Sequence, residues 1–334
     1  MIIIQSFPVA VALCFVTMLC WGSWANTQKL SKKDWPFQLF YWDYAIGVLL
    51  FSIVLAFTMG SMGQSGRSFL DDLAQASLIS LGLALLGGVV FNLANILLVA
   101  AIDIAGMAVA FPVGIGIALV LGVITNYLAA PSGDPVLLFS GVAFVTVAVL
   151  LDAWAYRKIS TDTKVQSKGL VLSVIAGVLM GFFYRFVAAS MSPDFNTVLE
   201  VGKLTPYTAI VFFSVGLLLS NFIFNTIVMK KPFVGDPVSF ADYFKKENRS
   251  LHFMGILGGM IWNLGMSLSI VASGIAGFAV SYGLGQGATM IAAFWGVFIW
   301  REFSGAPKGT NKLLVAMFIS FIAGLSLIII SKLV

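Results

Sequence analysis

The sequence is poor in charge, in histidine and in cysteine. Only 10% of its 334 residues are charged, against about 25% in a soluble domain, so a soluble enzyme, a nucleic-acid-binding protein and a disordered chain are excluded. The two cysteines, Cys14 and Cys20, lie in one apolar stretch and provide neither a disulfide framework nor a CxxC metal pair. The single histidine, His252, leaves little for metal binding or acid–base catalysis. No cofactor is expected.

Hydrophobic residues make up 60% of the chain and gather into long runs. A helix needs about 20 apolar residues to cross the hydrocarbon core of a bilayer. Ten runs of that length predict an all-α polytopic membrane protein with ten transmembrane helices. The expected spans are residues 8–28, 37–60, 76–100, 104–128, 136–156, 169–190, 205–229, 252–273, 275–299 and 312–332.

Lys and Arg are distributed unevenly between the two ends of the predicted spans. Fifteen of the 19 belong to the ends that follow odd-numbered spans, which include the loops 157–168 and 230–251. Basic loops face the cytoplasm. We therefore expect these loops inside, and both termini on the non-cytoplasmic side of an inner or plasma membrane.

The two halves of the chain resemble each other. Residues 87–116 align without a gap on residues 258–287, always 171 positions apart. Because each half holds five spans, the second copy has to cross the membrane in the opposite direction. The predicted units are a first five-helix repeat (1–156), a cytoplasmic linker (157–168) and an inverted second repeat (169–334). Inverted repeats around a central site are typical of secondary transporters.

Several segments are similar to a known family. Tyr41-Trp42-Asp43-Tyr44 with residues 49–63, the glycine-rich run ending at Asn95, and the late segment from Ile261 through Gln286 to Glu302 resemble the ureide permease family. The five-plus-five organisation resembles the drug/metabolite transporter superfamily. The late segment is also similar to the glucose/ribose/rhamnose sugar porters, which share a Gln at the position of Gln286.

The resemblance implies a transporter of small polar solutes that is coupled to protons. The sequence also has no HExxH, GxSxG or Walker motif, so neither an enzyme nor an ATP-driven pump is expected. This chain departs from the family pattern in two places. Met266 stands where the related families tend to have Asn. The plant members also carry a long central loop where this chain has a short one.

Amide and aromatic residues within the spans are candidates for a substrate site. Amides both donate and accept hydrogen bonds, and aromatic rings form flat apolar walls, so such a lining suits a small neutral polar solute. The alternatives are hydrogen bonds between helices for a single Asn and an interfacial aromatic belt for Trp24. The predicted substrate-binding residues are Trp24, Asn26, Asn92, Asn95, Trp262, Asn263, Tyr282 and Gln286.

Asp43 lies about 10 Å into its predicted helix, at 1.5 Å per residue from Pro36. A carboxylate shielded from water can carry a proton, so Asp43 is predicted to couple transport to protons, with sodium as the alternative ion. Its other interpretation is stabilisation of the positive end of its helix, with Lys32 or Lys33 as partner.

Two other features complete the site predictions. Asp152 and Glu302, at cytoplasmic helix ends, are predicted to form local ion pairs with the neighbouring Arg157 and Arg301. Small residues and a proline in the fourth and ninth spans predict close crossings and a bend at a gate. These residues are Pro112, Gly114, Gly283 and Gly285.

The chain is therefore predicted to import a small neutral polar solute by alternating access. A ureide or nucleobase-like substrate is preferred, a proton-coupled sugar transporter is the main alternative, and an exporter of drugs or metabolites is another. The expected partners are the substrate, protons and the lipid bilayer, without nucleic acid. Since ten spans can enclose a complete site, a monomer suffices, and a homodimer stays open.

Overall fold

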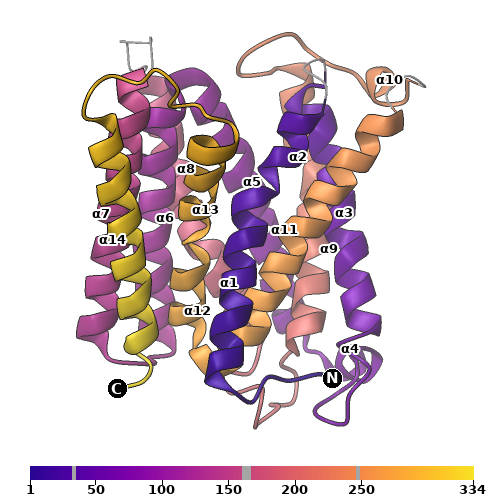
Figure 1. The fold of residues 1–334 in the computed structure, drawn as a ribbon. Coiled ribbons are helices and arrows are strands. Elements are labelled where there is room, and N and C mark those ends of the chain that lie inside the picture. Colours follow the sequence, from indigo (N-terminus) through magenta and orange to yellow (C-terminus); the bar gives the residue numbers. More distant parts are fainter. Residues whose placement is uncertain (32–34, 160–166, 246–248) are drawn as a thin grey trace.

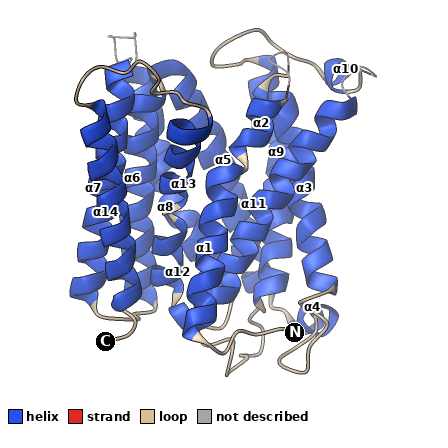
Figure 2. Cartoon of the chain, viewed as in Figure 1, coloured by secondary structure: helices blue, strands red, loops and turns tan. Residues whose placement is uncertain are grey.

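The computed structural model describes residues 1–31, 35–159, 167–245 and 249–334. Within these ranges the chain forms helices joined by loops, without a sheet (Figure 2). Ten segments are long and apolar enough to span a bilayer, which confirms the predicted all-α membrane fold. The spans are α1 with α2 (Phe7–Ser23, Ala25–Leu30), α3 (Phe37–Phe57), α5 (Leu78–Ala105), α6 (Met107–Ala129), α7 (Pro135–Ile159), α8 (Ser167–Ser190), α9 (Pro206–Lys230), α11 (Arg249–Ala276), α12 with α13 (Phe278–Gly285, Ala288–Phe294) and α14 (Thr310–Ile330).

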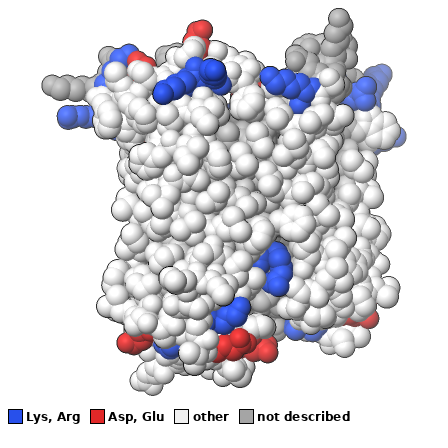
Figure 3. Space-filling model, turned by 180° about the vertical axis from the view of Figure 1, so that it is seen from behind, with Lys and Arg blue, Asp and Glu red and all other residues white. Residues whose placement is uncertain are grey.

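The spans stand side by side, and both termini lie at the same end of the bundle (Figure 1). The short helix α4 (Phe69–Gln75) is at this end, and α10 (Phe240–Tyr243) is at the other. Charged side chains gather at the two ends and leave a broad, largely uncharged belt between them (Figure 3). The belt matches the hydrocarbon core that the apolar spans require, while the side on which the termini lie stays a prediction.

Two of the predicted spans are interrupted. The first breaks at Trp24 between α1 and α2, and the ninth breaks at Gln286 and Gly287 between α12 and α13. The ninth span then ends in a π-helical turn, Trp295–Ile299. Within the predicted linker 157–168, α7 continues to Ile159 and α8 begins at Ser167. Residues 160–166 of that linker lie outside the described residues.

The third and eighth spans, α5 and α11, have matching lengths and ends. Each has 28 residues, and their first residues, Leu78 and Arg249, are 171 positions apart. Each helix ends at a glycine of positive φ, 80° at Gly106 and 83° at Gly277. Only glycine adopts such backbone angles readily. The offset of the sequence repeat thus recurs in the local structure.

Glycines allow two pairs of these helices to cross closely. A Cβ atom at Gly88 of α5 would lie 1.9 Å from the Phe213 carbonyl oxygen of α9. A Cβ atom at Gly259 of α11 would lie 2.0 Å from the Tyr44 carbonyl oxygen of α3. Gly88 and Gly259 are equivalent in the sequence repeat, so the α5–α9 and α3–α11 crossings have the relation that an inverted repeat predicts.

Candidate functional site

A cavity of about 690 Å³ lies within the bundle. Its size falls within the range of about 300–1,000 Å³ that is usual for small-molecule sites. Residues from α1, α2, α5, α6, α7, α8, α11 and the ninth span line it, so both halves of the chain contribute. Among the lining residues are Trp21, Trp24, Asn26, Lys29, Phe91, Asn95, Phe111, Pro112, Asp152, Tyr156, Trp262, Gln286, Thr289, Trp295, Trp300 and Glu302.

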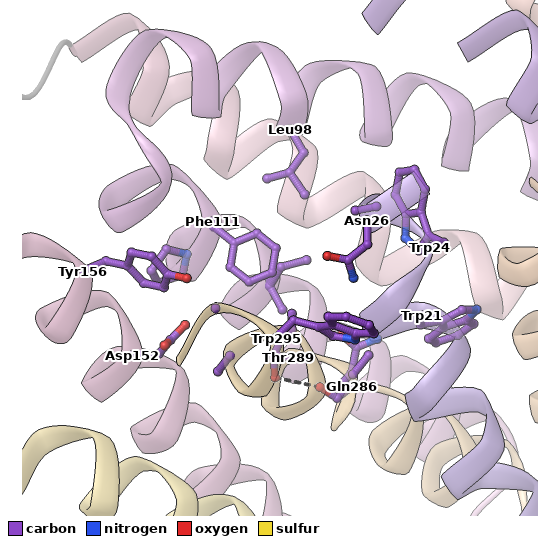
Figure 4. Close-up of a pocket in the computed structure, with 18 of the residues that line it drawn as sticks. Trp21, Trp24, Asn26, Leu98, Phe111, Asp152, Tyr156, Gln286, Thr289 and Trp295 are labelled. Atoms are coloured by element: carbon purple, nitrogen blue, oxygen red, sulfur yellow. Dashed lines mark hydrogen bonds between the residues drawn. The ribbon is translucent and has the colours of Figure 1, made fainter. Parts of the chain in front are cut away.

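The two interrupted spans are joined by hydrogen bonds in the wall of the cavity. The Trp295 indole nitrogen donates to the Ser23 hydroxyl at 2.9 Å, directly before the break at Trp24. The Trp300 indole nitrogen donates to Asn26 Oδ1 at 2.7 Å. Broken helices near the middle of a membrane leave polar groups free to meet a solute. These bonds fix the positions of Trp24 and Asn26 beside the ninth span (Figure 4).

An aromatic cluster closes the deep end of the cavity. Trp262 lies with its ring centroid 4.4 Å from that of Phe91 and stacks on Phe213 and Trp21, at 5.8 and 5.9 Å. The Trp21 indole nitrogen donates to the Trp262 carbonyl oxygen at 3.2 Å. Phe91 and Trp262 occupy equivalent positions of the repeat, 171 residues apart. The floor is therefore built from matching residues of the two halves.

Two amides face the cavity with hydrogen-bonding capacity to spare. Asn95 is 7% exposed and donates through Nδ2 to the Tyr41 hydroxyl at 3.2 Å. Gln286 is 9% exposed and lies at the break in the ninth span, where its backbone carbonyl accepts from the Thr289 hydroxyl (Figure 4). Among the described residues, no hydrogen bond engages the Gln286 side-chain amide. That amide can donate to and accept from a solute.

The cavity reaches the surface at the end of the bundle opposite the termini. There Lys29 Nζ pairs with Glu302 Oε1 at 2.6 Å, and the Tyr156 hydroxyl donates to Glu302 Oε2 at 2.6 Å. The Lys29 ammonium also lies 4.3 Å from the Trp300 ring centroid. Burial alone would raise the pKa of the Glu302 carboxyl, but the bonds from Lys29 and Tyr156 and the Lys29 charge outweigh it and lower that pKa.

The predicted ion pairs of Glu302 and Asp152 are wrong. Glu302 pairs with Lys29 rather than with its neighbour Arg301. Asp152 forms no ion pair with Arg157 among the described residues, because the two side chains are five positions apart on α7 and point in different directions.

At the opposite end of the bundle, an ion pair and hydrogen bonds link the two halves of the chain. The Arg67 guanidinium pairs with Asp72 at 2.8 Å and donates to the Lys203 carbonyl oxygen at 2.7 Å. Asp72 also accepts from the Thr205 backbone N–H at 2.7 Å. These bonds join α4 to the loop before α9 and leave the cavity with its opening at the other end.

Three of the predicted substrate-binding residues lie outside the cavity. Asn92 is fully buried and donates to the Leu217 carbonyl oxygen and the Ser220 hydroxyl. Asn263 is fully buried near the Ser214 hydroxyl at 3.4 Å. Tyr282 is fully buried as well. Its hydroxyl lies 3.2 Å from the Ala118 carbonyl oxygen and 3.3 Å from the Met180 carbonyl oxygen, and it donates toward them.

The other five predicted substrate-binding residues line the cavity together. They are Trp24, Asn26, Asn95, Trp262 and Gln286. The sequence analysis missed Phe91, Phe111, Asp152, Tyr156 and Trp295, which line it too. For Phe91 a signal was present, because it aligns with Trp262 in the repeat.

Asp43 lies outside the cavity, between α3, α10 and α11. It is 1% exposed and accepts from the Tyr243 hydroxyl at 2.5 Å. His252 Nδ1 lies 2.9 Å from Asp43 Oδ2. Burial, and then the bond to Asp43, raise the pKa of the Tyr243 hydroxyl. The partners proposed from the sequence, Lys32 and Lys33, lie outside the described residues.

The predicted gate residues are divided between the cavity and the helix crossings. Pro112 lines the cavity, and α6 runs through it without a break. Gly114 packs against Leu98, and Gly285 packs against Trp21. Gly283 precedes the break in the ninth span, which falls three residues later, at Gln286.

The ten spans found among the described residues, and the cavity between them, define a multi-pass membrane protein with room for a small solute. The family model of the ureide permeases matches residues 40–168 and 155–331. The chain therefore belongs to the ureide permease family, whose members are transporters and not enzymes.

Relatives match along the whole chain. Ureide permease 2 of Arabidopsis thaliana is 26% identical, with 99% of each chain covered. The probable ureide permease A3 of Vigna unguiculata is 23% identical over 92% of this chain and 99% of its own. A protein of known crystal structure has the same fold, with a TM-score of 0.57 at 15% identity, covering 98% of this chain and 100% of the other.

Proposed function

We propose that this protein is a secondary transporter that carries a ureide, or a nucleobase-like compound of similar shape, across the membrane by alternating access. The family and its relatives named ureide permeases support the substrate class. The observation that carries the proposal is the unengaged Gln286 amide within aromatic walls. A flat solute with N–H donors and carbonyl acceptors can stack on an aromatic ring and bond to one amide at its edge.

The same lining admits a sugar, so sugar transport is the alternative within this proposal. A sugar packs its C–H face on an aromatic ring and presents hydroxyls to an amide. The chemical difference lies in the planar N–H and C=O edge of a ureide. Export instead of import keeps the same site and reverses the direction.

The cavity opens at the end where most Lys and Arg side chains lie. If that end faces the cytoplasm, as the basic loops favour, this conformation is the inward-open state. The bonds of Arg67 and Asp72 then close the outer end. Transport requires these bonds to break as the mouth at Lys29 and Glu302 closes.

Proton coupling is part of the proposal. The sequence predicts Asp43 as the coupling carboxyl, and this carboxyl is buried in contact with His252. Because Asp43 lies outside the cavity, a coupling role requires it to act through a movement of α3 against α11. This role stays a prediction, and proton-driven uptake by the Asp43→Asn variant tests it.

The test is uptake into proteoliposomes with an inward proton gradient, using allantoin, uracil, hypoxanthine, glucose, ribose and rhamnose side by side. Uptake of the heterocycles but not of the sugars supports the proposed substrate. Uptake of sugars alone moves the protein to sugar transport. Absence of all uptake, with efflux from preloaded vesicles, supports export.

A further inference from the structure

Asp152 is a buried carboxylate that faces the cavity, and within the described ranges it has no ion-pair or hydrogen-bond partner. It lies on α7, one turn before Tyr156, and is 8% exposed. Its Oδ1 atom has no hydrogen-bond partner among the described residues. Figure 4 places its side chain beside that of Tyr156, across the cavity from Asn26 and Trp24.

The charged groups that the structure describes near Asp152 do not neutralise its charge. Glu302, the acidic group that faces it from the loop before α14, repels a second negative charge. Lys29, which also lines the cavity, is held by Glu302 at 2.6 Å. Tyr156 on α7 donates its hydroxyl to Glu302 and not to Asp152. On α7 itself, Arg157 is exposed, and Lys158 places its ammonium beside Gly309 in the loop before α14.

The helices packed against α7 supply no counter-ion either. These helices are α6 and α14. The titratable side chains of α6 and α14 are Tyr127 and Lys312. Tyr127 packs on Phe139, thirteen residues before Asp152 on α7, and Lys312 is exposed.

A carboxylate removed from water without a counter-ion or hydrogen bonds carries a large energetic cost, and binding a proton removes that cost. Asp43 differs, since it is also buried but has a hydroxyl donor and a histidine in contact. Of the two carboxylates, Asp152 therefore gains more in energy when it binds a proton. It also lines the cavity in which we place the solute.

We propose that Asp152, in place of the Asp43 that the sequence predicts, is the proton-binding carboxyl of the transport cycle. The proton comes from water when the cavity faces outward, forms an O–H bond on the Asp152 carboxylate, and returns to water when the cavity faces inward. The carboxyl stays neutral during the passage between the two states. This role rests on the proposed transport function, and it couples proton and solute through occupancy of one cavity.

The test compares three variants of the full chain in proteoliposomes, Asp152→Asn, Asp43→Asn and Asp103→Asn. Asp103 is exposed near the end of α5 and outside the cavity, so its variant is the matched control. With one proton per solute, a pH difference of one unit drives accumulation of up to about tenfold. We expect Asp152→Asn to lose this accumulation while exchange of labelled for unlabelled allantoin continues, and Asp103→Asn to keep it.

A second readout does not depend on the solute. Infrared spectra of the reconstituted protein near neutral pH should show the carbonyl band of a protonated carboxyl that disappears in Asp152→Asn and persists in Asp103→Asn. Accumulation by Asp152→Asn at the wild-type ratio overturns the proposal, and so does a wild-type band that Asp152→Asn leaves unchanged.

The two readouts also separate this inference from the proposed function. If the wild type transports none of the offered solutes but shows the Asp152 band, the substrate assignment fails and the proton-binding role is supported. If Asp152→Asn loses exchange as well as accumulation, the infrared spectra test the proposal: loss of the band in Asp152→Asn supports it, and an unchanged band overturns it. Loss of accumulation in Asp43→Asn alone assigns the coupling to Asp43.

Discussion

The two glycine crossings give a prediction whose size follows from the structure. Gly88→Ala places a Cβ atom 1.9 Å from the Phe213 carbonyl oxygen, and Gly259→Ala places one 2.0 Å from the Tyr44 carbonyl oxygen. Ordinary van der Waals contact begins at 3.4 Å, so each pair of helices has to separate by about 1.5 Å. The obstacle is the backbone of a packed helix, which cannot turn aside as a side chain can.

Overpacking of this kind costs about 1–3 kcal/mol. For a chain of this size, 1 kcal/mol corresponds to roughly 2 °C in Tm, so each variant should lose about 2–6 °C. The assay is thermal unfolding of the purified protein in detergent, followed by loss of the monodisperse peak. Gly82→Ala, on the same helix α5 as Gly88, is the control because a Cβ atom there meets nothing within 4 Å. It should keep or raise Tm, since Ala favours a helix over Gly by about 1 kcal/mol.

The outcomes separate two parts of the reasoning. If Gly88→Ala behaves like Gly82→Ala, the close crossing of α5 and α9 is refuted. If Gly88→Ala costs several degrees and Gly259→Ala costs nothing, the close α5–α9 crossing is supported and the matching α3–α11 crossing is refuted. The inverted repeat then loses its main structural support. Equal losses would support tight pairs, α5 with α9 and α3 with α11, that move as units during transport.

Two further predictions concern the cavity and its mouth. Gln286→Leu removes one hydrogen-bond donor and one acceptor, worth about 1–2 kcal/mol together, so solute affinity measured by tryptophan fluorescence should fall roughly 5- to 30-fold. Unchanged affinity would remove Gln286 from the site. The control is Gln28→Leu, because Gln28 lies outside the cavity. The lowered pKa of Glu302 stabilises the folded protein above the ordinary glutamate pKa of about 4.3, and this contribution is lost as pH falls through the lowered pKa. The Tm of the wild type should therefore decrease more steeply in acid than that of Glu302→Gln, and parallel curves would contradict the Lys29–Glu302 pair.

The spans could be predicted from the sequence because the bilayer imposes their length. A run of about 20 apolar residues has few other uses in a folded chain, and the expected ranges agree with the observed helices to within a few residues at most ends. The glycines at 106 and 277 were visible as matched positions, and the structure adds the reason for the match, a positive φ where each long helix ends.

The helix break at Gln286 could not be located from the sequence. Pro112 and several glycines suggested a bend, but α6 tolerates its proline and continues, while the ninth span opens three residues after Gly283. Neighbouring helices can supply the missing hydrogen bonds at a membrane proline. Whether a helix breaks is therefore decided by packing partners that a single segment does not reveal.

The misassignment of Asp152 had a different origin. The sequence placed it with Arg157 because the two are close along the chain, yet side chains share a helix face at spacings of three or four and not of five. That spacing singles out Tyr156, which lines the cavity beside it. Asp43 and His252 are different again, since 209 positions separate them and only the α3–α11 crossing brings them together.

Equivalent positions of the two halves meet at the cavity with unequal chemistry. Gln286 and Ile115 are 171 positions apart and both line it, one with an amide and the other with a hydrocarbon. Asn95 lines it too, while its counterpart Met266 is fully buried outside. A lining that kept the symmetry of the scaffold would offer a solute two equal orientations. The unequal positions leave one polar end at Gln286 and one apolar face at Ile115. We therefore expect the residues that break the repeat to set how a solute lies in the cavity.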